Sequence, residues 1–315
     1  MPVVKSLPPS AYTVGWICAL PLELTSAMAM LDEVHQSLPQ RLGDNNTYTL
    51  GAIRGHNTVI ACLPLGRYGI TSATKVASSM HSTFPAIRFS LLVGIGGGVP
   101  GKDADIRLGD VVVSMPSRTH PGVIQYDHGK TEAEGHFQRT GVLNKPPPGL
   151  LTATAKLQSK YAAGQDQVRE LLAEAVERNP RTSLFTYPGE QYDLLFQAQY
   201  EHISKDKTCI DCDHSQLVER KPRMGQEPKV HYGLIASGNQ VMKHGLTRDS
   251  VAQDLGALCF EMEAAGIMDD FPCLVIRGIS DYADSHKLEQ WQGYAAATAA
   301  AYTKELLSKV LYNHA

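Results

Sequence analysis

The sequence has little net charge and no long apolar run. Its 315 residues carry 29 lysines and arginines against 32 aspartates and glutamates, which gives a formal net charge of -3. A nucleic-acid-binding protein needs a clearly basic face, and a membrane-spanning helix needs about 18 to 20 apolar residues in a row. We therefore expect neither nucleic acid nor a membrane as a partner. Pro21 and Glu23 interrupt the first apolar stretch, which argues against a signal peptide, so we expect a cytoplasmic protein.

A disulfide framework, internal repeats and a clear linker are also lacking. The six cysteines lie mostly inside apolar segments, which is typical of reduced core residues. Hydrophobic residues make up 43% of the chain, enough for a sizeable core. We expect a single domain over residues 1–315. Residues 181–228 show no periodicity, and a stretch of that length predicts an irregular insertion with a function of its own, or a lid.

Elsewhere, strand-like and helix-like segments alternate. Several of the strands are apolar throughout, which is typical of a sheet covered on both faces, so the pattern indicates the α/β class. Residues 46–65 predict a β-hairpin that turns at Gly55-His56, and residues 264–271 predict a helix. Residues 125–139, "QYDHGKTEAEGHFQR", are interpreted as a loop.

One apolar strand runs into a glycine cluster, "VGIGGGVP". Gly94, Gly96 and Gly97 allow backbone N–H groups to approach a ligand closely. The run does not have the spacing of a dinucleotide-binding loop, and no Gly-Lys-Ser/Thr follows it, as a P-loop requires. A tight turn between strands is the alternative interpretation.

Carboxylates flank another apolar strand, "PCLVIRGIS". Glu261 and Glu263 precede it, Asp281 follows it, and Glu23 comes just after the first strand. Ligands of open α/β sheets bind beyond the carboxyl ends of the strands, so these acids are predicted to reach one crevice. They form a candidate acid/base group. The alternative for each is an acid that stabilises a helix N-terminus.

The segments "ICALPLEL", "VGIGGGVP", "GLIASGNQV", "FEMEAAGI" and "VIRGISDYAD" together resemble the nucleoside phosphorylase/nucleosidase superfamily. The pattern is most similar to the 5'-methylthioadenosine/S-adenosylhomocysteine nucleosidases and their fungal purine or ATP nucleosidase-like relatives. The resemblance implies a three-layer α/β/α sandwich with a mixed, partly closed central sheet. It also implies cleavage of the N-glycosidic bond of nucleosides, no cofactor, a small-molecule purine nucleoside or nucleotide as partner, and a homo-oligomer.

The resemblance also assigns roles to residues. Asp281 matches the acid that protonates or hydrogen-bonds N7 of the purine, and Glu23 matches the general base that activates water. Glu263 matches the ligand of the ribose hydroxyls, with Met262 packed under the sugar. The remaining purine-binding residues that the resemblance implies are Ser280, Asn239, Val241 and Met242.

Hydrolysis is favoured over phosphorolysis by what surrounds the glycine run. Phosphorylase relatives hold phosphate with an arginine and a serine there, whereas this chain has Leu92 and Ile95. A phosphate ion would also face the carboxylate of Glu23, which would repel it. We expect a hydrolase acting on adenine nucleosides or nucleotides, possible substrates including AMP and ATP. A phosphate-dependent purine nucleoside phosphorylase and a non-catalytic nucleotide-sensing module remain as alternatives.

Two further groups of residues are candidates for binding. Arg67, His128 and Lys130 are candidate phosphate ligands, because a nucleotide needs cations at the mouth of the site; the alternative is an ordinary solvated loop. Cys209 and Cys212, with His202 nearby, have spacing that occurs in zinc sites. Because only one such Cys pair is present, we expect no metal, and two thiols in an ordered insertion are the simpler interpretation.

Overall fold

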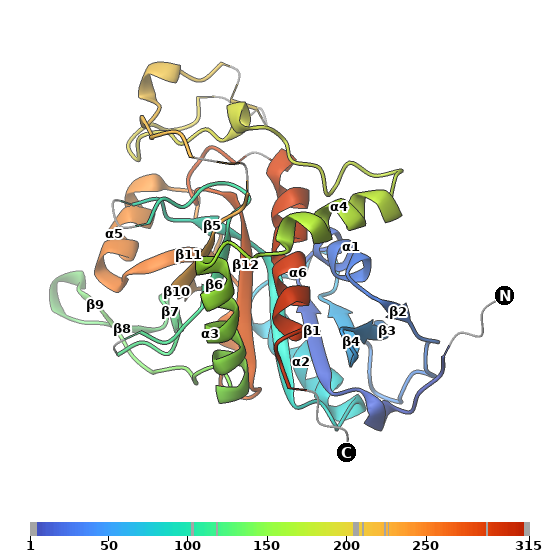
Figure 1. Ribbon diagram of the computed structural model, residues 1–315. Helices are drawn as coiled ribbons and strands as arrows, with labels where there is room; N and C mark the ends of the chain where they lie inside the picture. Colours follow the sequence, from blue (N-terminus) through green and yellow to red (C-terminus); the bar gives the residue numbers. More distant parts are fainter. Residues whose placement is uncertain are drawn as a thin grey trace.

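The computed structural model describes residues 5–101, 104–117, 119–203, 208–209, 211–223, 225, 227–287 and 289–311. A mixed sheet forms its centre, with the strand order β11-β10-β6-β12-β5-β1-β4-β3-β2 (Figure 1). The strands of this order are β1 (Val14–Cys18), β2 (Glu33–Val34), β3 (Tyr48–Ile53), β4 (His56–Cys62), β5 (Phe89–Gly98), β6 (Val111–Ser114), β10 (Val230–Ser237), β11 (Ala257–Glu261) and β12 (Cys273–Asp281). A further strand, β7 (Val123–Gln125), pairs with β10.

The sheet closes on itself over part of its width. Strand β5 pairs in parallel with β12 on one side, and its glycine-rich end pairs antiparallel with β11. Gly97 lies opposite both Phe260 of β11 and Asp281 of β12. Since β11, β10, β6 and β12 are themselves linked in that order, the five strands form a ring. The predicted partly closed mixed sheet is confirmed.

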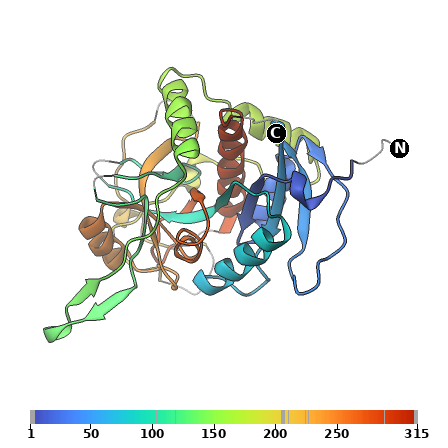
Figure 2. The same cartoon turned by 90° about the horizontal axis from the view of Figure 1, so that it is seen from below.

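Helices cover both faces of the sheet. The alanine-rich α6 (Gln292–Leu307) packs on β12 and β5, and α1 (Pro21–Ala29), α3 (Pro148–Ala162) and α4 (Val168–Arg178) contact it. Helix α2 (Ile70–Thr83) lies on the opposite side of the sheet, as Figure 2 shows. Helix α5 (Gly245–Leu255) precedes β11 and contacts it. The three-layer α/β/α arrangement is therefore present, and its core contains apolar residues of most of these elements. Among the described residues no helix is long and apolar enough to cross a membrane.

Three local predictions differ from the structure. Residues 125–139 are not a plain loop, because β8 (Gly129–Thr131) and β9 (Phe137–Arg139) pair as a hairpin that projects outward (Figure 2). Residues 264–271 form only the 3-10 turn η5 (Ala264–Gly266). The glycine run is part of β5 rather than a turn after it. The glycine run is extended because it pairs with β11 and β12, which are distant in sequence, and sequence periodicity does not report such pairing.

Short 3-10 turns make up the rest of the regular structure of the described residues: η1 (Pro9–Ala11), η2 (Ala133–Gly135), η3 (Glu190–Tyr192), η4 (His214–Gln216) and η6 (Glu289–Trp291). Within 181–228, two of these turns and one bridge between Phe196 and Leu217 are the only regular elements of the described residues. The described residues of this segment lie over one end of the sheet (Figure 1). Arg220 anchors it by donating a hydrogen bond of 2.7 Å to the hydroxyl of Tyr282, just after β12.

Candidate active site

A pocket lies at the carboxyl ends of β1, β11 and β12. It encloses about 800 Å³ of empty space, part of it open to solvent. Side chains that the sequence separates by up to 258 positions meet in it: Glu23, Met262, Glu263, Ser280 and Asp281 all line the pocket. The rule that parallel strand ends gather at one edge of a sheet therefore brings these residues together.

Glu23 is held from three sides by backbone N–H groups. Its Oε2 accepts hydrogen bonds from Ala19 at 2.6 Å and Leu20 at 2.9 Å, and its Oε1 accepts one from Ile95 at 2.8 Å. The bond to Leu20 belongs to the first turn of α1, so the acid does support that helix N-terminus. It also faces the pocket. Burial raises the pKa of Glu23, while Arg277 and these N–H groups oppose the rise, so this carboxyl group can exchange a proton more readily than a solvated glutamate near neutral pH.

Arg277, in the middle of β12, is the buried cation of the site. Its Nη2 donates to Oε2 of Glu261 and, at 3.3 Å, to Oε2 of Glu263, and its Nη1 donates to the carbonyl oxygen of Ile95 at 3.3 Å. All three charged side chains are nearly inaccessible to solvent. Glu261 also accepts the backbone N–H groups of Glu263 and Ala264. Glu261 is thereby fully engaged as a structural partner, whereas Glu263 keeps hydrogen-bonding capacity toward the pocket.

Glu263 has a pKa that is displaced from the ordinary value of a glutamate. Its Oε1 accepts the N–H of Gly69 at 3.2 Å, where the positive φ of 91° at Gly69 turns the chain into α2. Burial raises the pKa of Glu263 to about 7; Arg277 opposes this, and the charges of Glu261 and Glu23 add to it. A buried acid that titrates near neutrality in a pocket is a feature of functional sites.

Asp281 ends β12 and points into the same pocket. Its Oδ1 accepts the N–H of Ala283 at 2.9 Å, and its Oδ2 accepts the hydroxyl of Ser280 at 3.0 Å and Nζ of Lys287 at 3.2 Å. Lys287 also lines the pocket, and its side chain is 31% exposed. A carboxylate, a hydroxyl and an ammonium group thus lie together at one end of the pocket and can pass a proton to a bound molecule.

The glycines of β5 make room for these side chains. A Cβ at position 94 would clash with Oε1 of Glu23 and lie 2.7 Å from Nη1 of Arg277. At position 97 it would lie 2.9 Å from Oδ1 of Asp281, and at position 96 it would lie 2.5 Å from the sulfur of Cys259. Gly96 and Gly97 also line the pocket. The run is therefore explained by close approach of buried side chains to the strand.

Not every candidate reaches the pocket. Val241 and Met242 line it, but Asn239 does not; its N–H donates to Asp127 at 2.6 Å, and its amide oxygen packs on Gly69. Arg67 is exposed and precedes Tyr68, which does line the pocket.

His128 and Lys130 lie on the outward hairpin side of the molecule. His128 lines a different cavity, and Lys130 pairs with Glu132 at 2.9 Å. The structure therefore does not bring these two candidate phosphate ligands into the pocket. His202, Cys209 and Cys212 do lie together, but apart from the pocket residues.

The pocket residues that sequence reasoning did not assign include Tyr68, Arg277, Lys287 and Gln292. A signal existed for Arg277, because an arginine within an otherwise apolar strand must find a buried partner. No such signal existed for Lys287, whose position depends on how the chain turns after β12.

Comparison with known proteins agrees with this geometry. The model of the phosphorylase superfamily matches residues 13–311. The chain belongs to the phosphorylase superfamily. It is 50% identical to a nucleotide-binding leucine-rich repeat (NLR)-like protein of Hyaloscypha variabilis over 303 residues, which are 96% of this chain and 30% of the relative. It thus spans less than a third of that relative.

A second relative matches along nearly its whole length. The 5'-methylthioadenosine/S-adenosylhomocysteine nucleosidase of Mycobacterium bovis is 25% identical over 308 residues, covering 94% of this chain and 96% of the enzyme. Two solved structures share the phosphorylase superfamily fold at 17% identity. One is the Neisseria meningitidis nucleosidase of the same name in complex with methylthio-immucillin-A, with a TM-score of 0.60 and coverage of 94% and 98%. The other is the futalosine hydrolase of Helicobacter pylori, with a TM-score of 0.59 and coverage of 94% and 97%.

Proposed function

We propose that this protein is a purine N-ribosyl hydrolase that splits adenine nucleosides or nucleotides into free base and ribose or ribose phosphate. The observation that carries the proposal is the meeting of Glu23, Glu263 and Asp281 around one pocket. The nucleosidase named among the relatives supports the same reaction class. A pure binding module needs neither a buried base nor an acid beside a proton source.

The proposed reaction uses the two ends of the pocket. Glu23 takes a proton from a water molecule, whose oxygen bonds to C1' of the ribose. The C1'–N9 bond breaks, and its electron pair passes to the base. Asp281, with Ser280 and Lys287 beside it, delivers a hydrogen bond or proton to N7, so that the base leaves neutral. Glu263 accepts the ribose hydroxyls, and Val241 and Met242 pack against the purine.

Water is a better nucleophile for this pocket than phosphate. The N–H of Ile95, a natural anion donor, is already bonded to Glu23 at 2.8 Å. Arg277 is neutralised by Glu261 and Glu263. A phosphate ion there would meet carboxylates with no unpaired cation at hand, which is unfavourable in a buried site.

Product analysis tests the proposal. Adenosine, methylthioadenosine, AMP and ATP are each incubated with the protein, with and without phosphate, and the products are separated by chromatography. Free adenine and ribose, or ribose phosphate, without added phosphate are expected. Base release only with phosphate, together with ribose 1-phosphate, would identify a phosphorylase instead. The absence of base from every substrate would favour a nucleotide-sensing module.

Position 94 tests the placement of Glu23. Gly94→Ala introduces a methyl group against the Glu23 carboxylate, and misplacement of a reacting group by about 1 Å can cost about 100-fold in rate. We expect a loss of that order in kcat on adenosine, together with a loss of thermal stability, because the methyl group overpacks a buried site. Gly101→Ala is the matched control, because nothing lies within 4 Å of a Cβ at that exposed position. Equal rates in the two variants would contradict the role of Glu23.

Glu263 gives a pH prediction. Its pKa of about 7 means that its acid form accumulates below that pH, whereas ribose hydroxyls donate best to the carboxylate. Adenosine binding should therefore release protons near pH 6, and affinity should rise with pH until about 7 and then level off. Calorimetry on Asp281→Asn, in two buffers of different ionisation enthalpy, measures the proton release. Glu263→Gln should bind weakly and without proton release; release that persists in Glu263→Gln would assign the titration to another group.

The nucleotide part of the proposal depends on Arg67. Arg67 is exposed and directly precedes the pocket residue Tyr68, and we propose that its guanidinium meets a 5'-phosphate group. Arg67→Ala should raise KM for AMP or ATP by about 10-fold, as loss of one exposed charge contact allows, and leave adenosine unchanged. Lys130→Ala, whose lysine pairs with Glu132 outside the pocket, serves as the control. An equal effect of Arg67→Ala on adenosine and ATP would remove the claim.

A further inference from the structure

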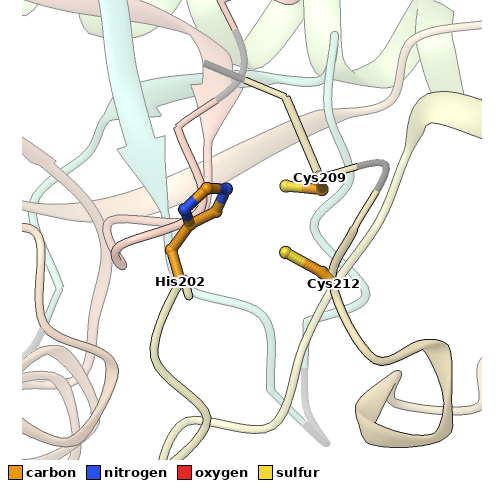
Figure 3. A group of neighbouring side chains, drawn as sticks. All are labelled: His202, Cys209 and Cys212. Carbon is orange, nitrogen blue, oxygen red and sulfur yellow. The ribbon is translucent and has the colours of Figure 1, made fainter. Parts of the chain in front are cut away.

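Three side chains of the 181–228 segment gather at one point. One ligand-type atom each from His202, Cys209 and Cys212 lies within 4.8 Å of the other two. Figure 3 shows both thiol sulfurs pointing toward the imidazole ring of His202. In a tetrahedral zinc site, with Zn–S near 2.3 Å and Zn–N near 2.0–2.1 Å, ligand atoms lie roughly 3.5–3.8 Å apart. The group needs to contract by only about 1 Å to bind an ion.

The two cysteines are not placed as reactive thiols. Both are buried. Reactive cysteines lie in electropositive, accessible surroundings that lower the pKa. Two thiolates would, by contrast, balance the charge of one Zn²⁺ and leave the buried site neutral.

A second observation comes from outside the segment. His286, which follows β12, is buried, and both of its ring nitrogens lack a hydrogen-bond partner among the described residues. A buried imidazole without partners is costly. Its ring stacks on Phe196 at 4.2 Å, and its centroid lies 5.4 Å from that of His202. Two imidazoles bound to one tetrahedral zinc ion have centroids roughly 5 Å apart, as the Zn–N length requires.

A carboxylate lies near His286, just beyond hydrogen-bond distance, where a metal-ligating histidine usually has its outer partner. Nδ1 of His286 faces Oδ1 of Asp284 at 3.7 Å, which leaves Nε2 for another role. Ligating histidines usually direct their second nitrogen to a carboxylate or a carbonyl, which fixes the ring. Nε2 of His202 lies 3.0 Å from the carbonyl oxygen of Thr208. If Nδ1 of His202 binds the ion, this contact is kept; if Nε2 binds the ion, the contact is lost.

We propose that Cys209, Cys212, His202 and His286 bind one Zn²⁺ ion that fastens the 181–228 segment to the end of β12. Two cysteines and two histidines are a common structural zinc set. The N–H of His202 already donates to Oγ of Ser285 at 2.9 Å, so the ion would strengthen an existing contact. Residues 281–287, which include Asp281 and Lys287 of the pocket, would then be held from outside.

The test measures metal in the purified full chain. After gel filtration, mass spectrometry should find about one zinc per chain in the wild type and in Cys62→Ser, a control on β4. Cys209→Ser and Cys212→Ser should lose it. Cobalt(II) added to chelator-treated wild type should give a thiolate-to-metal charge-transfer band, which needs no variant. Chelation should also raise hydrogen exchange in residues 199–203 and 211–216.

The outcomes separate the alternatives. Wild type without zinc and without the cobalt band, or with Cys209 and Cys212 found as a disulfide by intact mass, would overturn the site. Full zinc in Cys209→Ser would do the same. His286→Gln should weaken zinc binding at least about 10-fold, as changes to ligands and their partners do; unchanged affinity would overturn the assignment of the fourth ligand. None of these readouts depends on the hydrolase activity.

Discussion

Asp281→Asn should lower kcat on the preferred adenine substrate by about 100- to 10,000-fold, the usual cost of removing one positioned acid or base. Asparagine keeps the size of the side chain and can still bond to Ala283, Ser280 and Lys287, but it cannot deliver a proton to N7. KM should change little, because the ribose contacts at Glu263 are unaffected. Steady-state kinetics by adenine release measures the effect.

Two comparisons sharpen this result. The exposed Asp270 is the matched control, and Asp270→Asn should leave both kcat and thermal stability unchanged. The kcat of Glu23→Gln should fall by a factor similar to that of Asp281→Asn, because this change removes the base that activates water. Turnover of Asp281→Asn within a few-fold of wild type would refute the assigned acid.

Lys287 is a pocket residue that the sequence does not predict. Its ammonium group lies 3.2 Å from Oδ2 of Asp281. The sequence places it six residues beyond Asp281, after the strand has ended, where neither periodicity nor strand geometry indicates direction. By contrast, the acids themselves could be predicted, because each lies at the carboxyl end of a strand and parallel strands end at one edge.

The glycine run could be interpreted only in part from the sequence. Its glycines predict that some group approaches the backbone closely, but they do not identify that group. In the structure the approaching groups are Glu23 of α1, Asp281 of β12 and Cys259 of β11. Cys259 is brought there by the pairing of β11 with the end of β5. Antiparallel closure of one strand onto the end of another is a long-range pairing, and local sequence carries no record of it. The hairpin at 129–139 was missed for the opposite reason, since its short polar strands lack apolar alternation.

Arg277 explains why the flanking acids are tolerated at all. The apolar strand between them is interrupted by one arginine, which binds Glu261 and Glu263 and acts on Glu23. Burial of these carboxylates would be costly without it. Because a buried arginine needs an anionic partner, its position in this strand would by itself indicate that nearby glutamates are its partners.

The largest stability effect is therefore expected at this residue. Arg277→Met fills the space but leaves buried carboxylates without their cation, and breaking a buried pair in this way costs about 3–5 kcal/mol. Urea unfolding at pH 8 measures the loss in the free energy of unfolding. The loss should shrink toward pH 5, because protonated glutamates no longer need the cation and burial already raises the pKa of Glu23 and Glu263.

A double variant tests whether charge is the cause. Glu261→Gln removes the carboxylate that lies closest to Arg277, so Arg277→Met combined with Glu261→Gln should be more stable than Arg277→Met alone, which shows coupling between the two sites. If volume alone mattered, the second change would add its own cost instead. A loss below about 1 kcal/mol in Arg277→Met, unchanged between pH 5 and pH 8, would mean that water rather than Arg277 compensates the acids, since a solvated pair contributes about that little.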